Sequence, residues 1–236
     1  MITIQVEVFT IIIITVILIA VLFYLNKQIK KADPLQTPKG GFLVASILVT
    51  MVDDMVTGIV NKKYAKWLGP YIGTIGAYIF FSNIIGLFGI EPPTANFSVT
   101  LTLALMTWVL IQWTSIKESG FGGYLKGFFE PMPLFLPMNI FGTIGPLISM
   151  SLRLFGNILS GGIIMSLLHT FTTWVSSLIP VIGKLDFLGI IISVPLHAYF
   201  DLFAGLIQMF IFIMLTMVFI GNNVSEEDTT EIQEEV

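Results

Sequence analysis

Long runs of apolar residues alternate with short polar segments along this chain. The first three runs cover residues 8–25, 71–90 and 98–116, and each is close to the ~20 residues that a helix needs to cross a bilayer. Two longer runs follow at residues 138–168 and 187–220. This pattern predicts an all-α polytopic membrane protein with five transmembrane helices.

Residues 42–61 follow a different pattern, because their polar side chains recur on one helical face. Apolar residues surround the rest of that helix, which is typical of an amphipathic helix lying in the membrane interface. The segment 62–67, rich in lysine and aromatic residues, fits the same interface. A short re-entrant hairpin is the alternative interpretation. The polar positions are Ser46, Thr50, Asp53, Asp54, Thr57 and Asn61.

The last two apolar runs are longer than one bilayer crossing requires. About 30 residues at about 1.5 Å each give about 45 Å, against a hydrocarbon core of about 30 Å. We therefore expect two long, steeply tilted helices, with Pro146 bending the first near its start. His169 and residues 171–186 are expected in the connection between them.

Breaks between the runs divide the chain into six segments. The proline-rich stretch 131–137 cannot form a regular helix. The acidic end of the chain has no basic residue and predicts a disordered tail. The segments are 1–41 (transmembrane helix and basic linker), 42–70 (interfacial helix and loop), 71–116 (transmembrane hairpin), 117–137 (cytoplasmic loop), 138–221 (tilted helix pair) and 222–236 (tail).

Lysine placement predicts the orientation. If residues 42–61 do not cross the membrane, nine lysines lie on one side and only Lys184 lies on the other. The positive-inside rule makes the lysine-rich side the cytoplasm. The N-terminus is then outside and the C-terminus cytoplasmic. The nine are Lys27, Lys30, Lys31, Lys39, Lys62, Lys63, Lys66, Lys117 and Lys126.

Composition removes several other classes of protein. The chain has 236 residues, of which 55% are hydrophobic and 11% charged, and a mean hydropathy of +0.91, which excludes a soluble domain. It has no cysteine and two histidines, so we expect no disulfide framework, metal site or cofactor. No nucleic-acid partner is expected. The first apolar run lacks the features of a cleavable signal peptide. No Walker-type glycine loop occurs, so the chain is not an ATPase alone.

One arginine, Arg153, stands near the middle of the run 138–168. Its guanidinium stays charged, and a mid-bilayer position costs at least about 2.5–3.5 kcal/mol on insertion scales. Ser149, Asn157 and Ser160 share its helical face. Such a stripe predicts a face turned toward a partner or an aqueous cavity. The alternatives are a structural arginine paired inside the bundle, or one snorkelling to an interface.

The last apolar run carries a second polar face. Asp201 is the only acid deep in an apolar run, and His197 one turn away can exchange protons near neutral pH. With Asn83 in the second run, these groups predict a hydrated ion path. The alternative is a structural Asp201–Arg153 ion pair joining two helices, with His197 as an interface histidine. The face comprises Ser193, His197, Asp201, Gly205 and Gln208.

Four ordered segments resemble subunit a of the F-type ATP synthase membrane sector. The resemblance covers most of the chain from Tyr71 to Gly221. The segments are E-P-P-T-A-N-F-S-V-T-L-T-L-A-L (91–105), P-M-P-L-F-L-P-M-N-I (131–140), S-L-R-L-F-G-N-I-L-S-G-G (151–162) and H-A-Y-F-D-L-F-A-G-L-I-Q-M-F-I-F-I-M-L-T-M (197–217).

The resemblance implies a stator subunit in a bacterial cell membrane that works only within the multisubunit ATP synthase. Its partners would be the c-ring, the peripheral-stalk b subunits and membrane lipid. Two offset half-channels would carry protons to and from c-ring carboxylates and couple ion flow to ATP synthesis, with Na⁺ as the alternative ion. Arg153 matches the family's essential arginine. Asn157 and Gln208 match polar positions near it.

One departure from the family's pattern is informative. Many bacterial relatives have a glutamate where this chain has Gly162, and often a histidine where it has Asp201. We therefore expect that the acid has moved to the facing helix, where Asp201 supplies the carboxylate of the outer half-channel.

Two other classes compete with this reading. A secondary transporter or channel would show an inverted repeat or a run of filter carbonyls, and the sequence shows neither. A membrane scaffold would tolerate loss of Arg153 without loss of ion translocation.

Overall fold

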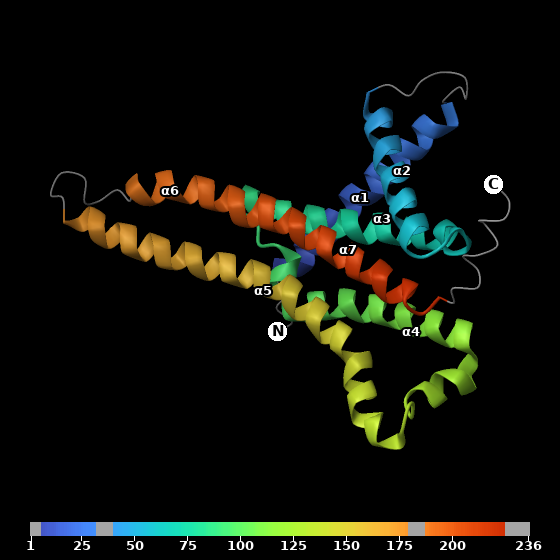
Figure 1. Ribbon diagram of the computed structural model, residues 1–236. Helices are drawn as coiled ribbons and strands as arrows, with labels where there is room; N and C mark the ends of the chain where they lie inside the picture. The colour runs from blue at the N-terminus through green and yellow to red at the C-terminus, as the bar shows by residue number, and fades with distance from the viewer. Residues whose placement is uncertain (1–5, 32–39, 179–186, 225–236) are drawn as a thin grey trace, which may run out of the picture.

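The computed structural model describes residues 6–31, 40–178 and 187–224, without the side chains of residues 6, 7, 31 and 187. Every regular element in these ranges is helical (Figure 1). The expected tail beyond residue 224 lies outside the described residues, as do Lys39, Lys184 and residues 179–186 of the expected connection.

Seven α-helices and four short segments follow one another along the described chain. The π-helical segment η4 joins α6 to α7, so the three form one rod. The helices are α1 (Val6–Lys31), α2 (Gly41–Ile59), α3 (Lys62–Ile84), α4 (Phe97–Gly127), α5 (Leu136–Ser177), α6 (Phe187–His197) and α7 (Gly205–Gly221); the short segments are η1 (Ile85–Phe88), η2 (Pro93–Ala95), η3 (Pro133–Phe135) and η4 (Ala198–Ala204).

Six helical rods within the described residues are long and apolar enough to cross a membrane. This confirms the expected all-α polytopic membrane protein. The rod of α2 meets the same criterion as the others, since length and composition do not separate a crossing helix from an interfacial one. The division into five crossings and one interfacial helix therefore stays a prediction.

Three helices are longer than expected. α3 begins at Lys62, and α4 continues through residues 117–127, which we predicted as loop, although Gly120 at φ 69° breaks its axis. α5 runs to Ser177, so the placement of His169 and residues 171–177 in a connection was wrong. The reason is visible in the sequence: residues 163–179 contain no glycine or proline to end the helix.

The core lies among α2, α3, α4, α7 and the first half of α5. α4 contributes a face of small side chains that lets neighbouring helices approach closely. The hydroxyls of Thr100, Thr107 and Thr114 on that face donate to carbonyls three or four residues earlier, and Thr107 Oγ1 also lies 2.7 Å from the Tyr71 hydroxyl of α3. The largest core side chains are Tyr64, Leu68, Ile72, Ile79, Met150, Leu154, Phe212, Met217 and Ile220.

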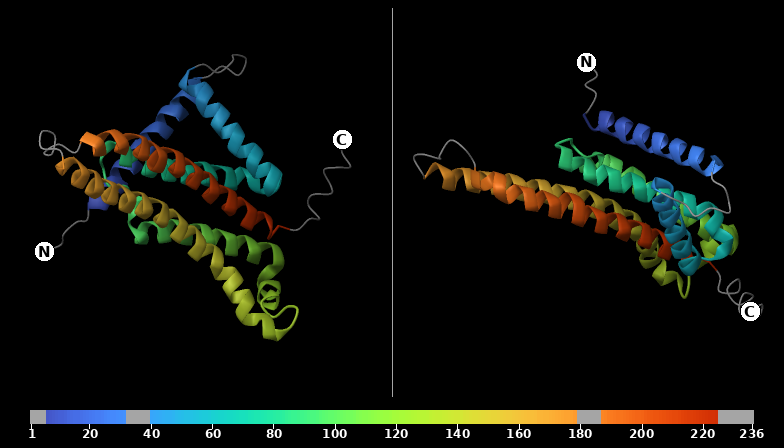
Figure 2. Two further views of the ribbon diagram at one scale, coloured as in Figure 1. Left: turned by 60° about the vertical axis from the view of Figure 1, so that its left-hand side comes forward. Right: turned by 90° about the horizontal axis from the view of Figure 1, so that it is seen from above.

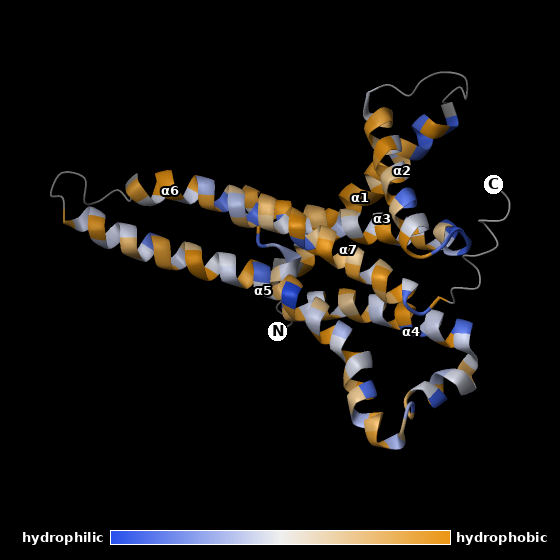
Figure 3. Ribbon diagram, in the orientation of Figure 1, coloured by the Kyte–Doolittle hydropathy of each residue, from blue (hydrophilic) through white to orange (hydrophobic). Residues whose placement is uncertain are grey.

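The α5 helix and the α6–α7 rod lie side by side and extend well beyond the core (Figures 1 and 2). The 42 residues of α5 give a length of about 63 Å, twice a hydrocarbon core of about 30 Å. α5 is bent in its first third, where Pro146 lies. The helices are predominantly apolar along their length (Figure 3), and many large apolar side chains are exposed.

The ends of the helices sort into two groups. The start of α3 and the ends of α4 and α7 lie at one end of the molecule. The end of α5 and the start of α6 lie together at the opposite end (Figures 1 and 2). α2 runs across this common direction rather than along it. A helix crossing the bundle direction in this way is the geometry that an interfacial α2 requires.

Candidate ion-translocation site

Arg153 lies on the exposed face of α5. Its Nη2 donates a hydrogen bond of 3.4 Å to Ser149 Oγ, one turn earlier. Among the described residues no ion pair joins Arg153 to a carboxylate. The flanking Leu152 is 51% exposed and Ile148 is likewise 51% exposed, so the charge stands on an apolar surface. Arg153 is therefore presented outward and does not form the structural ion pair with Asp201.

The rest of the predicted α5 stripe splits between surface and interior. Ser149 and Ser160 are exposed, and the Ser160 hydroxyl donates to the Asn157 carbonyl at 3.0 Å. Asn157 is half-buried, and its buried Nδ2 has no hydrogen-bond partner among the described residues. This buried amide nitrogen is therefore a hydrogen-bond donor that the described residues leave unused.

Asp201 lies inside the π-helical segment η4. This segment begins directly after α6, which ends at His197. The two side chains meet, with His197 Nδ1 2.9 Å from Asp201 Oδ2. The histidine side chain is 46% exposed and the carboxylate 19% exposed. Pro195 shortly before lacks the N–H that would bond the preceding turn, which loosens the regular helix. π-helical turns occur often at functional sites.

The Asp201 carboxyl group packs against the backbone of Gly86 in η1. A Cβ atom at Gly86 would lie 3.4 to 3.6 Å from its Cγ, Oδ1 and Oδ2 atoms. These distances are ordinary van der Waals contacts, so the carboxyl group lies directly against the segment that follows α3. Gly86 thus contributes one wall of the Asp201 environment.

Asn83 forms a buried joint between three elements. It is 1% exposed, and its Nδ2 donates to the Gly205 carbonyl at 3.0 Å, while Thr94 Oγ1 donates to its Oδ1 at 3.2 Å. This joint ties α3, η2 and α7 together one turn beyond Asp201. Both ends of the Asn83 amide are therefore occupied by the chain itself.

The predicted polar face of the last helix becomes less exposed from His197 onward. Ser193 is half-buried, and its hydroxyl donates to the Ile190 carbonyl at 3.0 Å. His197 is exposed and Asp201 half-buried, whereas Gln208 is 6% exposed. Its buried Nε2 has no partner among the described residues. The face thus opens at the α6 end and closes toward the core.

The last helix approaches α5 closely at one glycine. A Cβ atom at Gly161 would lie 3.3 Å from the Phe200 Cβ, so this position admits the η4 segment. Gly162, the next residue, is exposed, and a Cβ there would have nothing within 4 Å.

Sequence reasoning missed four features of this site. Thr94 lies in the turn between α3 and α4 and has no periodic signal, while Gly86 and Gly161 resemble other glycines of the apolar runs. The π-helical segment has Pro195 as its only hint. These features depend on contacts between segments far apart in sequence.

A family profile and several relatives of known name all match this chain over most of its length. The family profile described as ATP synthase A chain matches residues 8–221. The chain is 35% identical over 201 residues to "ATP synthase subunit a, sodium ion specific" of Propionigenium modestum, covering 75% of this chain and 64% of that protein. It is 37% identical over 196 residues to ATP synthase subunit a of Priestia megaterium, covering 78% and 80% respectively. The subunit a of Mycoplasma genitalium is 34% identical over 229 residues, covering 89% and 76%.

Proposed function

The chain belongs to the ATP synthase A chain family, that is, subunit a of the membrane sector, and from this premise we propose that it conducts ions to and from the carboxylates of a rotating c-ring. A subunit a is part of the multisubunit complex and not an enzyme on its own. The proposal is that this chain is the stator that couples ion flow to rotation and hence to ATP synthesis.

The outward position of Arg153 carries the proposal. A fixed positive charge on an apolar, exposed surface needs a partner that the described residues do not supply. A c-ring carboxylate passing this surface is such a partner, because a nearby positive charge favours the deprotonated form of a carboxyl group. The same charge repels a cation and so keeps the two half-channels separate.

Asp201 and His197 form the outer half-channel in this proposal. The exposed imidazole meets the half-buried carboxylate at 2.9 Å, so a proton can pass from water to the interior through adjacent groups. Gln208 and Asn157 offer free amide nitrogens further in, on the two facing helices. The carboxylate thus stands on the last helix, while α5 has Gly162 where many relatives carry a glutamate.

The proposed cycle of ion transport uses these positions. An ion enters through the outer half-channel, neutralises a ring carboxylate and rides the ring through lipid. It leaves by the second half-channel when its carboxylate returns toward Arg153. We propose the proton as the coupling ion on the strength of the His197–Asp201 pair. The name of the Propionigenium modestum relative makes Na⁺ the alternative to test.

The proposed topology has α1, α3, α4, α5 and the α6–α7 rod crossing a bacterial cell membrane. The N-terminus is outside, the C-terminus is cytoplasmic, and α2 lies in the cytoplasmic interface. The lysines of α3 and α4 stand at the same end of the bundle, which supports this orientation. The c-ring faces Arg153, and the peripheral-stalk b subunits contact other surfaces.

ATP-driven proton pumping in inverted membrane vesicles tests the proposal. Arg153→Ala should abolish pumping at equal amounts of assembled complex, because the ring carboxylate loses its positive partner. Lys126→Ala removes an exposed cation from α4 and serves as the control, with pumping unchanged. Retained pumping in Arg153→Ala would reduce this arginine to a structural charge. A strict Na⁺ requirement would replace the proton by Na⁺.

A further inference from the structure

A hollow of about 250 Å³ lies between α3 and α4 at their lysine-rich ends. One wall is Trp67 of α3, and the other is a single face of α4 that carries Leu110, Trp113, Thr114 and Lys117. None of these residues belongs to the proposed ion path. We propose that this hollow binds the head group of an anionic phospholipid.

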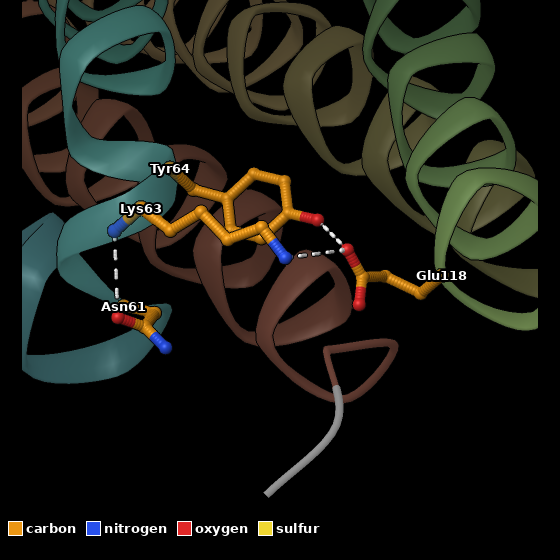
Figure 4. A network of polar contacts seen from close by, with 4 residues as sticks. All are labelled: Asn61, Lys63, Tyr64 and Glu118. Atoms are coloured by element: carbon orange, nitrogen blue, oxygen red, sulfur yellow. Dashed lines mark hydrogen bonds and ion pairs between the residues drawn. The ribbon is translucent and has the colours of Figure 1, made fainter. Parts of the chain in front are cut away.

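The charge balance around the hollow is positive. Glu118 follows Lys117 on α4, but its side chain is only 11% exposed and is already engaged by Lys63 Nζ at 3.7 Å and by the Tyr64 hydroxyl (Figure 4). Lys117 Nζ lies 5.8 Å from the centre of the Tyr64 ring, and no ion pair joins it to a carboxylate in the described part of the chain. The exposed Lys66 adds a further charge beside Trp67.

Two tryptophans place the hollow at the depth of lipid head groups. Trp113 is 65% exposed and Trp67 37% exposed, and the Trp67 ring packs edge-on against Tyr64 at 5.9 Å. Indole rings are enriched at the membrane–water interface, where their apolar bodies meet lipid and their N–H groups meet water. A site framed by two such rings and a lysine has the polarity gradient of a phospholipid.

An apolar stripe continues from the hollow toward the middle of α4. Met106 is 54% exposed and Val109 51% exposed, and they share the face of Trp113. A bound phospholipid would place its phosphate at Lys117 and run its acyl chains along these side chains. Basic pockets between transmembrane helices on the cytoplasmic side bind anionic lipids in this way. This inference rests on α3 and α4 crossing the membrane and not on the proposed ion path.

Photo-crosslinking in the assembled complex tests the site. The complex is reconstituted in phosphatidylcholine vesicles that contain a photoreactive phosphatidylglycerol or, in parallel, a photoreactive phosphatidylcholine, and labelled peptides are mapped by mass spectrometry. The phosphatidylglycerol probe should label residues 105–117 several-fold more than the phosphatidylcholine probe. Lys117→Gln should lower that labelling several-fold. Lys126→Gln, on the same helix beyond Gly120, should leave it unchanged.

A competition experiment with unlabelled lipids uses only the wild-type chain, so its result does not depend on whether a variant assembles. Unlabelled phosphatidylglycerol should reduce the labelling of the wild-type chain, whereas unlabelled phosphatidylcholine should not. Equal labelling by both probes, or equal loss in the two lysine variants, would overturn the proposal.

Discussion

At the scale of single residues, the site separates two kinds of charge. Arg153 keeps its charge at any physiological pH and stands exposed on α5, where it can act on a group from another chain. Asp201 is half-buried and shares a hydrogen bond with His197, where both groups can exchange a proton. A permanent charge suits a barrier between half-channels, and an exchangeable pair suits a path.

A substitution at Asp201 tests the second of these roles. Asp201→Asn keeps the shape of the side chain but cannot carry a proton as a carboxylate does. We expect ATP-driven pumping to fall at least about tenfold, which corresponds to about 1.4 kcal/mol. Tyr199→Phe, which removes an exposed hydroxyl from the same π-helical segment, should pump normally. Unchanged pumping in Asp201→Asn would remove this residue from the ion path.

At the scale of elements, the site depends on how closely three helices approach. The start of α7 meets the end of α3 where Gly205 faces Asn83, and η4 meets α5 where Gly161 faces Phe200. Asn83 adds hydrogen bonds to the Gly205 carbonyl and to Thr94, which fix the rod against α3. The position of Asp201, one turn before Gly205, follows from these contacts.

Adding one methyl group at the α3–α7 contact tests its role. In Gly205→Ala the new Cβ would lie 2.8 Å from the Asn83 Cβ, so a helix or the Asn83 joint must shift. We expect a loss of about 1–3 kcal/mol of stability from this overpacking. It should appear as a lower thermal midpoint and yield of the complex.

A matched glycine on α3 gives the control. In Gly73→Ala the new Cβ meets nothing within 4 Å, and alanine is the better helix former. This variant should assemble as well as wild type or better. If both alanine variants behaved alike, close approach at Gly205 would not be the cause.

At the scale of the whole molecule, the arrangement has two parts. A packed bundle of α2, α3, α4, α7 and the first half of α5 contains most of the buried apolar side chains. The second half of α5 and α6 extend beyond it with large apolar residues exposed, as Leu167 at 64% and Val194 at 66% show. Such surfaces require lipid or another subunit to cover them.

Cysteine accessibility tests the membrane arrangement, and the chain has no native cysteine to interfere. With a membrane-impermeant maleimide, Gly41→Cys and Lys62→Cys should both label in inverted vesicles and not in intact cells, because an interfacial α2 keeps both ends on the cytoplasmic side. Glu91→Cys, in the exposed turn between α3 and α4, should label only from outside. Labelling of Gly41→Cys and Lys62→Cys from opposite sides would make α2 a sixth crossing.

The sequence by itself determined that the chain is an all-α polytopic membrane protein built from long apolar helices. Apolar runs and lone charges such as Arg153 are local signals, because the cost of placing polar groups in hydrocarbon acts on each segment separately. The i, i+4 spacing likewise placed His197 and Asp201 one turn apart on one helical face, and in the structure their side chains meet. The end of α5 was predicted too early, although the stretch beyond residue 168 has no glycine or proline to end the helix before Ser177.

Only the tertiary structure decided which partner each group has. In the structure Arg153 faces outward and Asp201 contacts His197, although the sequence allowed an ion pair between Arg153 and Asp201. The structure also joined Asn83 to the Gly205 carbonyl and to Thr94, contacts that no spacing in the sequence indicates. The physical reason is that these contacts join segments far apart in the chain, and their formation depends on how closely whole helices pack.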